Sequence, residues 1–363
     1  METKGESQTM VDTASSEASK IAFVEEWEPV KLMASSADYY YDSYNHYGVH
    51  EDVLKDTVTT HAYQRAIKQN VHLFRDAVVL DVSAGLGINA LFAAQAGAKK
   101  VIALESQPEL VAMGCKVAER NGYGADVLEF VCGTASSLEK LPGGIEHVDI
   151  IVSEWMGYFL MYEARLSEVV MARDKWLKKP GGLVFPDRAK IYSAMMEDAA
   201  YKQHHFDYYG SVWGFDFSAM KDAAHSEPVV SIFEPGQLLT SPVCVLDLNL
   251  NTCTADDLFE MASSFQLICK REGKAHAALF WFEMRFEACH KPIFFTTAPE
   301  SVPTCWKQTA FFISGPPLSM KANDRLRCMI ATRKPDKSRR SLDIKLSWRV
   351  NSAKPRQQIY RWS

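Results

Sequence analysis

The sequence lacks cysteine pairs spaced as CxxC, His/Cys spacings typical of a metal site, and any apolar run near 18 residues. Its eight cysteines are scattered, so we expect neither a structural zinc site nor a transmembrane helix. We also recognise no signal peptide. These absences favour free thiols in a reducing compartment, and we expect a cytoplasmic protein, with the nucleus as the alternative.

An excess of charge of one sign is also missing. The 40 basic and 45 acidic residues leave a net charge of −5, which argues against a dominant nucleic-acid footprint and leans weakly toward basic protein partners. Basic residues do gather at 333–340, a run that we interpret as a solvated turn between strands. RNA binding through such local surfaces stays open, whereas no membrane partner is expected.

The chain of 363 residues suits about two domains, preceded by an extension. Residues 1–36 are rich in Ser, Thr and Glu with few large apolar side chains, which predicts disorder. In residues 37–185, short apolar strands alternate with helical segments, which indicates a parallel, doubly wound α/β sheet covered on both faces. The strands expected there are 78–82, 99–105, 127–133 and 147–155.

Residues 186–363 follow a different pattern of short, alternating strands bounded by Pro, Gly and Asn, which predicts an antiparallel sandwich or barrel. The clearest strands are 242–250, 275–288, 307–313, 325–332 and 342–350. The aromatic-rich segment 201–222 fits neither half and is typical of an interface arm. Its alternative is a helical hairpin packed on its own chain.

Two groups of residues carry chemistry. The turn DVSAGLG (81–87) follows the first strand and Glu105 ends the second, a pattern in which small residues admit a nucleotide and the acid bonds its ribose. In SEWMGYFLMYE (153–163), Glu154 and Glu163 lie nine residues apart after the fourth strand. Two carboxylates there can clamp a planar guanidinium. Alternatively, one acid is exposed and the other caps a helix.

SEWMGY…YE resembles the double-glutamate loop of the protein arginine methyltransferases. Residues 38–51 are similar to the family's N-terminal helix motif, 172–189 to its exit from the nucleotide-binding domain, and 299–309 to its Thr-His-Trp loop. The resemblance extends from about Asp38 to the C-terminus and is greatest to the type I enzymes, which make asymmetric dimethylarginine.

This resemblance implies S-adenosyl-L-methionine as cofactor and no metal. It implies a Rossmann-like methyltransferase domain, then a β-barrel with a helical dimerisation arm inserted at about 201–233. The arm of one chain would dock on the partner's nucleotide-binding domain. The implied catalytic residues are Glu154, Glu163, Met156, Trp306 and Cys305, the last in place of His. The implied cofactor residues are Tyr40, Tyr44, His50, Thr59, Asp81, Ser83, Gly85, Gly87, Glu105 and Ser136.

Five positions depart from the family pattern, and all belong to the ligand cleft; one of them is Leu86, which stands where a Thr is usual. Ser83 replaces the first turn glycine, so its Cβ is expected to hinder a positive φ or the approach of the ligand. Thr59 replaces the arginine that grips the donor carboxylate, a loss of roughly 1.5–3 kcal/mol. Ser136 stands where an acid reaches the adenine, and Cys305 where a histidine positions the acids.

From these departures we expect weak donor binding or none. The favoured hypothesis is therefore a prozyme-like regulatory subunit that pairs with an active paralogue in a heterodimer or heterotetramer. An alternative is a chain that is itself an active arginine methyltransferase, with Arg/Gly-rich RNA-binding proteins as substrates. A further alternative is a binding module for arginine-rich or RNA-associated proteins.

Overall fold

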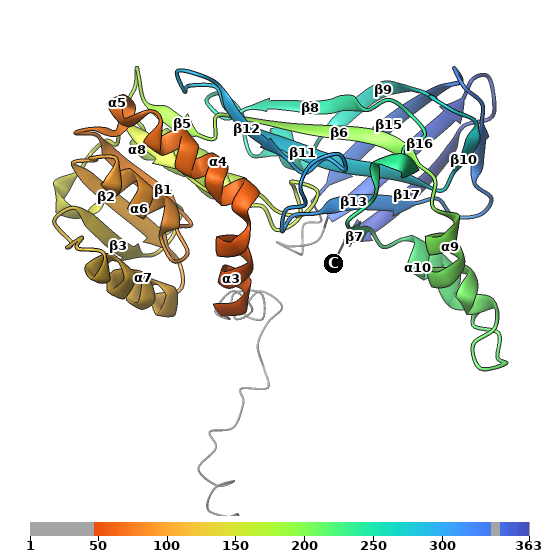
Figure 1. Cartoon of the computed structure of the whole chain (residues 1–363), viewed down its shortest axis with the longest axis horizontal. Coiled ribbons are helices and arrows are strands. Elements are labelled where there is room, and N and C mark those ends of the chain that lie inside the picture. Colours follow the sequence, from red (N-terminus) through yellow and green to blue (C-terminus); the bar gives the residue numbers. More distant parts are fainter. Residues whose placement is uncertain (1–46, 335–341, 363) are drawn as a thin grey trace, which may run out of the picture. The chain divides into compact units, whose positions relative to one another are not determined.

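Five parallel strands form the sheet of the N-terminal half (Figure 1). They are β1 (Val78–Val82), β2 (Lys100–Glu105), β3 (Leu128–Cys132), β4 (Ile150–Val152) and β5 (Leu183–Phe185). The spatial order is β3-β2-β1-β4-β5, so the direction of winding reverses between β1 and β4. Ligands of such sheets bind outside the carboxyl ends of the strands at this reversal. The doubly wound parallel sheet predicted from the sequence is confirmed.

The computed structural model describes residues 47–334 and 342–362. The predicted extension 1–36 and the residues Tyr40 and Tyr44 lie outside this part of the chain. The helices of the first half are α3 (Tyr47–Lys55), α4 (Thr57–Lys68), α5 (Val71–Phe74), α6 (Ile88–Gln95), α7 (Pro108–Arg120) and α8 (Leu166–Trp176), with the 3-10 turn η1 (Pro142–Gly144). No helix in the described residues is long and apolar enough to cross a membrane.

The C-terminal half is built from antiparallel sheets, as the alternating sequence pattern predicted. Its largest sheet has the order β7-β13-β11-β6-β8, with β12 added to β11, and a second has the order β17-β16-β15-β9. β10 and β14 form a separate pair. The strands are β6 (Arg188–Met196), β7 (Val229–Ser231), β8 (Val243–Asn249), β9 (Ala262–Ile268), β10 (Gly273–Ala275), β11 (Ala277–Phe286), β12 (Ile293–Thr296), β13 (Gln308–Phe312), β14 (Leu318–Met320), β15 (Arg325–Arg333), β16 (Leu342–Val350) and β17 (Arg356–Trp362).

Short helices between β6 and β7 occupy the segment predicted to be an interface arm (green in Figure 1). They are α9 (Ala199–His205), η2 (Asp207–Gly210), η3 (Ser218–Met220) and α10 (Lys221–His225). The turns η4 (Pro235–Gln237) and α11 (Asp256–Phe259) follow later in the chain. Phe206 packs against the His225 ring at 4.1 Å, which ties the two ends of the segment together. Trp213 is 94% exposed and Phe215 70%, so the segment presents large apolar side chains to solvent.

Helix α4 links the two halves at the edge of the sheet reversal. Its Tyr63 ring lies edge-on to Phe286 of β11 at 5.0 Å, and the Tyr63 hydroxyl donates to the Ser153 carbonyl at 2.8 Å. The Asn70 side-chain oxygen accepts a bond from the His290 backbone N–H at 2.9 Å. These contacts hold α4 against both the barrel and the loop that follows β4, beside the carboxyl ends of the parallel strands.

Candidate functional site

Both glycines of the turn after β1 adopt positive φ, a conformation that favours glycine. Gly85 has φ 55° and Gly87 φ 82°, and an added Cβ at Gly87 would overlap the Phe130 ring. The Gly85 N–H donates to a Glu105 carboxylate oxygen at 2.9 Å, which fixes the turn to β2. Ser83 itself adopts φ 59°, so its Cβ does not prevent the positive φ, and the expected hindrance to the approach of the ligand stays a prediction. A left-handed conformation with a Cβ costs about 1–2 kcal/mol.

The Glu105 carboxylate, at the end of β2, is held in place by backbone hydrogen bonds. It is 1% exposed, and its Oε1 accepts bonds from the N–H groups of Ser106 at 2.7 Å and Gln107 at 3.0 Å. Because the backbone orients this carboxylate, its remaining acceptor capacity is pre-positioned for hydroxyl donors. Asp81 on β1 is also 1% exposed, and burial, then the charges of Glu154 and Glu105, raise its pKa. Its Oδ2 has no partner among the described residues.

Thr59 faces the cap of its own helix. It is 1% exposed, and its hydroxyl donates to the Asp56 carboxylate at 3.1 Å. Asp56 caps α4 through the N–H groups of Val58 and Thr59 and also accepts the Cys305 N–H at 2.9 Å. Since Thr59 is not among the residues that line the pocket described below, position 59 contributes neither charge nor surface to it.

The loop after β4 holds the two predicted acids. Phe159, Leu160 and Glu163 adopt φ of 56°, 65° and 64°, and an added Cβ at Gly157 would overlap the Tyr162 carbonyl. Left-handed backbone at three non-glycine residues is costly and persists only where packing enforces it. Here the Phe159 ring packs edge-on to two barrel rings at 5.2 Å, Phe280 and Phe311. The barrel therefore shapes the loop that carries Glu154 and Glu163.

Glu154 is poised to titrate near neutral pH. Burial, and then the charge of Asp56, raise the pKa of Glu154 to about 7. The Ser153 hydroxyl beside it donates to the Val82 carbonyl at 2.7 Å, which fixes the start of the loop against β1. A guanidinium placed at this carboxylate would favour its ionised form and lower that pKa.

One pocket is lined both by the turn after β1 with Glu105 and by the loop that carries Glu154 and Glu163. Of the predicted residues, those that line it are His50, Ser83, Gly85, Glu105, Glu154, Met156, Glu163 and Trp306. The sequence interpretation missed Arg165, which lines the same pocket and occupies the N-cap position of α8. Among the described residues lining the pocket, Arg165 is the only Lys or Arg. Its position could have indicated this role, because Arg165 follows Glu163 by two residues and directly precedes a helix.

A second pocket adjoins the first on the barrel side. It is lined by Glu163, Trp306, Cys305, Asp52 and Asp56, among others, and Trp306 and Glu163 belong to both pockets. Burial, followed by the charges of Asp56 and Glu154, raises the pKa of the Cys305 thiol far above its usual range. Cys305 is therefore a neutral thiol at the mouth of the site.

Four of the predicted residues that the structure describes line neither pocket: Thr59, Asp81, Gly87 and Ser136. Ser136 instead donates from its N–H and hydroxyl to the Glu168 carboxylate, at 3.1 and 2.9 Å. No cluster of three or more His, Cys, Asp or Glu suited to a metal ion occurs in the described residues. The charged and titratable side chains of the first pocket are three acids, one histidine and one arginine.

The doubly wound parallel sheet and the antiparallel sheets thus form an α/β domain joined to a barrel, with a pocket lined by acids beside the sheet. A methyltransferase domain model matches residues 80–185, and a model of the arginine methyltransferase oligomerization subdomain matches residues 187–353. The chain is 42% identical over 324 residues to protein arginine N-methyltransferase 1 of Schizosaccharomyces pombe, covering 89% of this chain and 93% of the relative. The corresponding protein of Caenorhabditis elegans is 40% identical over 320 residues, covering 88% and 90%.

Two solved structures are also similar. A chain of the Trypanosoma brucei PRMT1 enzyme-prozyme heterotetrameric complex with AdoHcy aligns with a TM-score of 0.83 and 34% identity, covering 88% of this chain and 100% of that one. Protein arginine methyltransferase 10 of Arabidopsis thaliana aligns with a TM-score of 0.78 and 27% identity, covering 89% and 99%. The chain belongs to the protein arginine methyltransferase family.

Proposed function

We propose that this chain is itself an S-adenosylmethionine-dependent protein arginine N-methyltransferase, acting on Arg/Gly-rich proteins. The observation that carries the proposal is the shared pocket, whose lining includes both Glu105 of the nucleotide side and Glu154 and Glu163 of the guanidinium side. Group transfer needs the two reacting atoms about 3–3.5 Å apart, so both partners must enter one cavity. The relatives named protein arginine N-methyltransferase 1 favour this alternative over the prozyme hypothesis.

The chain's own residues fit the cofactor. S-adenosylmethionine, when bound, supplies an electrophilic methyl group. Glu105, held by three backbone N–H groups, would accept the ribose hydroxyls, and the turn from Ser83 to Gly85 would admit the nucleoside. Because Thr59 carries no charge, we assign the grip on the cofactor's carboxylate to Arg165, the cation of the pocket lining. Arginine forms strong, charge-assisted bonds to a carboxylate.

On the other side, Glu154 and Glu163 would hold the substrate guanidinium. Paired carboxylates fix the plane of the guanidinium and leave one nitrogen directed at the methyl group. Once the methyl group is attached, the guanidinium releases a proton readily, so Glu154 and Glu163 would need little strength as bases. Trp306, which lines both pockets, would form the wall along which the substrate side chain enters.

The test is turnover by the isolated full-length chain. Purified protein would be incubated with S-adenosylmethionine and an Arg/Gly-rich peptide, and methylarginine would be measured by mass spectrometry. We expect product from the wild type and none above background from Glu154→Gln. If the wild type makes no product alone, yet does so when co-expressed with an active paralogue, the proposal fails.

A second candidate, the prozyme-type regulatory subunit, is favoured by one observation. The residue that replaces the family arginine, Thr59, is sequestered against Asp56 and leaves the donor carboxylate without its usual partner. In this version the chain would complete an active paralogue through the arm. The similar chain from the Trypanosoma brucei enzyme-prozyme complex is consistent with such a partner.

Either version needs an interface at the arm, and its exposed side chains support one. Trp213 and Phe215 are the most exposed large apolar residues of the segment, and aromatic side chains of this kind dominate binding energy at interfaces. We expect Trp213→Ser to weaken self- or hetero-association about 30-fold, since a hot-spot side chain contributes about 2 kcal/mol or more. Analytical ultracentrifugation measures the change, with exposed Val302→Ser on the barrel as the control.

A further inference from the structure

The outer face of the sheet β17-β16-β15-β9 carries an unbalanced set of cations. Along β15 the residues alternate strictly between exposed and buried, and Leu326, Cys328 and Ile330 face the core. The opposite face therefore holds a group that we call the basic face: Arg325, Arg327, Arg333, Lys345, Arg349 and Arg361. Asp343 is the only acid of β9, β15, β16 or β17 on that face. Six cations against one acid give +5, in a chain whose net charge is −5.

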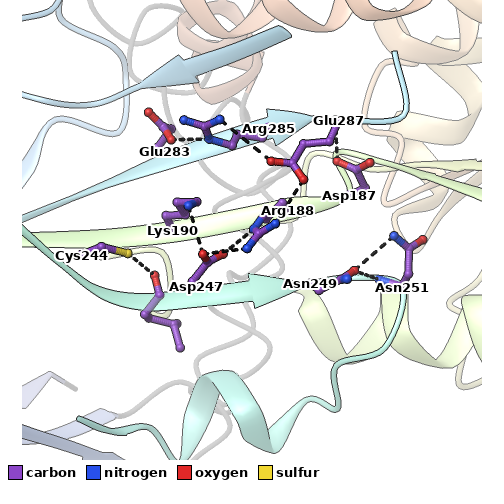
Figure 2. A network of polar contacts seen from close by, with 11 residues as sticks. Asp187, Arg188, Lys190, Cys244, Asp247, Asn249, Asn251, Glu283, Arg285 and Glu287 are labelled. Carbon is purple, nitrogen blue, oxygen red and sulfur yellow. Dashed lines mark hydrogen bonds and ion pairs between the residues drawn. The ribbon is translucent and has the colours of Figure 1, made fainter. Parts of the chain in front are cut away.

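In the other large barrel sheet, which contains β6, β8 and β11, positive and negative side chains balance. There Arg188, Lys190 and Arg285 are matched by Asp247, Glu283 and Glu287 in one network of ion pairs (Figure 2). Lys190 lies 3.0 Å from Asp247, for example, and Arg188 3.2 Å from Glu287. Ion pairs of this kind connect neighbouring strands and leave no excess charge for a partner. The excess of positive charge is therefore a property of the basic face and not of both barrel sheets.

Most of the basic face has no acidic partner among the residues that the structure describes. Asp343 pairs with Arg333 and Arg361, each at 3.1 Å. Within residues 47–334 and 342–362, no ion pair involves Arg325, Arg327, Lys345 or Arg349. Arg327 and Arg349 even stand directly opposite each other on neighbouring strands. Like charges in that position destabilise a sheet unless an anion lies between them.

The chemistry of the face points to a phosphodiester chain. Five of its six cations are arginines, whose planar donors match phosphate bidentately. Alternate residues of a strand lie about 7 Å apart and neighbouring strands about 4.8 Å, so the cations form an extended array suited to a polyanion. Ser264, Gln266 and Gln357 lie on the same exposed face and supply further donors of the kind that contact phosphate and sugar.

A single strand fits better than a duplex or a bilayer. The face is a sheet of four strands, broader than the helix or two-stranded ribbon that a major groove admits. The exposed apolar residues Ile268, Met329 and Ile359 are separate, since they pair with Arg325, Ser347 and Lys345 across the strands. They do not form the continuous apolar face by which proteins enter a membrane surface. We propose that the basic face binds single-stranded RNA through its phosphates, independently of the methyltransferase pocket.

The experiment uses the full chain without methyl donor, so that its result does not depend on the proposed enzyme activity. Binding of a fluorescein-labelled 20-nucleotide uridine RNA is followed by fluorescence anisotropy at several salt concentrations. The test variant is Arg327→Glu/Arg349→Glu. The matched control is Lys116→Glu/Arg120→Glu, which makes the same charge change on exposed residues of α7. Circular dichroism melting verifies that both variants fold.

We expect the wild type to bind, with affinity that falls steeply with salt. In the test variant the affinity should drop at least tenfold, and the log–log salt slope should shrink by about 1.4, because each contact with a single-strand phosphate contributes about 0.7. The control should bind like the wild type. Equal binding by both variants would overturn the proposal, as would a folded wild type that binds no RNA. Binding to phosphatidylserine vesicles or polyglutamate in place of RNA would also overturn it.

Discussion

The pocket has two sides: the acceptor side, formed by the loop of Glu154 and Glu163, and the donor side, formed by the turn after β1 and Glu105. Different contacts hold each side in place. The acceptor loop is pinned by buried aromatic packing of Phe159 on the barrel and by the bond from the Ser153 hydroxyl to β1. On the donor side, the Gly85 N–H of the turn is bonded to Glu105. The Thr59 hydroxyl, however, is bonded to Asp56, the residue that caps α4. The comparison teaches that packing holds the loop of Glu154 and Glu163 in place, whereas the side chain at position 59 is turned away from the pocket. We propose that Arg165 grips the cofactor's carboxylate in its place.

The largest effect should follow from breaking the acceptor side. Glu154→Gln keeps the shape of the carboxylate but removes its charge, so we expect turnover to fall about 10²–10³-fold, the usual cost of losing one charge-stabilising group. Binding of S-adenosylhomocysteine should change little, because Glu105 and the turn are untouched. Single-turnover kinetics with calorimetry measures both quantities. Exposed Glu119→Gln on α7 is the control, and a comparable loss in Glu119→Gln would show that the effect is unspecific.

A smaller effect should follow from breaking the donor side. Arg165→Met keeps the bulk of the side chain and removes its charge, so the dissociation constant of S-adenosylhomocysteine should rise about 10- to 100-fold, the equivalent of a lost charge-assisted pair of 1.5–3 kcal/mol. Thr59→Arg in the same background tests whether the family position can restore binding. An unchanged dissociation constant in Arg165→Met would remove Arg165 from the donor site.

The pH profile of turnover sharpens the comparison further. Because the pKa of Glu154 is raised to about 7, this group is neutral below that pH and ionised above it. The clamp needs the ionised form, so kcat/KM should rise about tenfold per pH unit below pH 7 and level off above it. The sign for stability is opposite: burial disfavours the ionised carboxylate, so its contribution to the free energy of unfolding is lost as pH rises through 7. A flat kcat/KM profile between pH 6 and 8 would contradict this assignment.

The smallest effect concerns the donor turn. Ser83 carries a Cβ at φ 59°, so Ser83→Gly should relieve strain and raise the free energy of unfolding by about 0.5–1 kcal/mol. Donor affinity should change less than in Arg165→Met, because the turn already has its binding shape. Urea denaturation measures the stability change. A less stable variant would mean that the Ser83 side chain contributes more than its backbone costs.

The strand pattern was largely predictable from the sequence. The apolar run 78–82 and the alternation in 342–350 coincide with β1 and β16. β9 and β17 were not predicted, because polar residues fill their exposed positions and leave few apolar ones, such as Leu267 and Tyr360, to signal a strand. β6 was not predicted either: its last four residues are all buried, so the alternation does not continue along the strand.

The site was predictable in its residue types and less so in its geometry. Glu105, Glu154 and Glu163 line one pocket, as expected for an acid that ends β2 and for two acids in the loop after β4. The sequence does not reveal that Thr59 turns toward Asp56 or that Arg165 reaches the pocket, since both depend on tertiary packing. Nor does it reveal left-handed backbone at Phe159 and Leu160, because neither residue is a glycine.

The most direct measurement is calorimetric titration of the isolated wild-type chain with S-adenosylhomocysteine. The account predicts saturable binding at one site per chain, with a dissociation constant in the micromolar range that weakens in Arg165→Met. Heat that appears only when an active paralogue is co-purified, with none from the chain alone, would contradict an autonomous donor site.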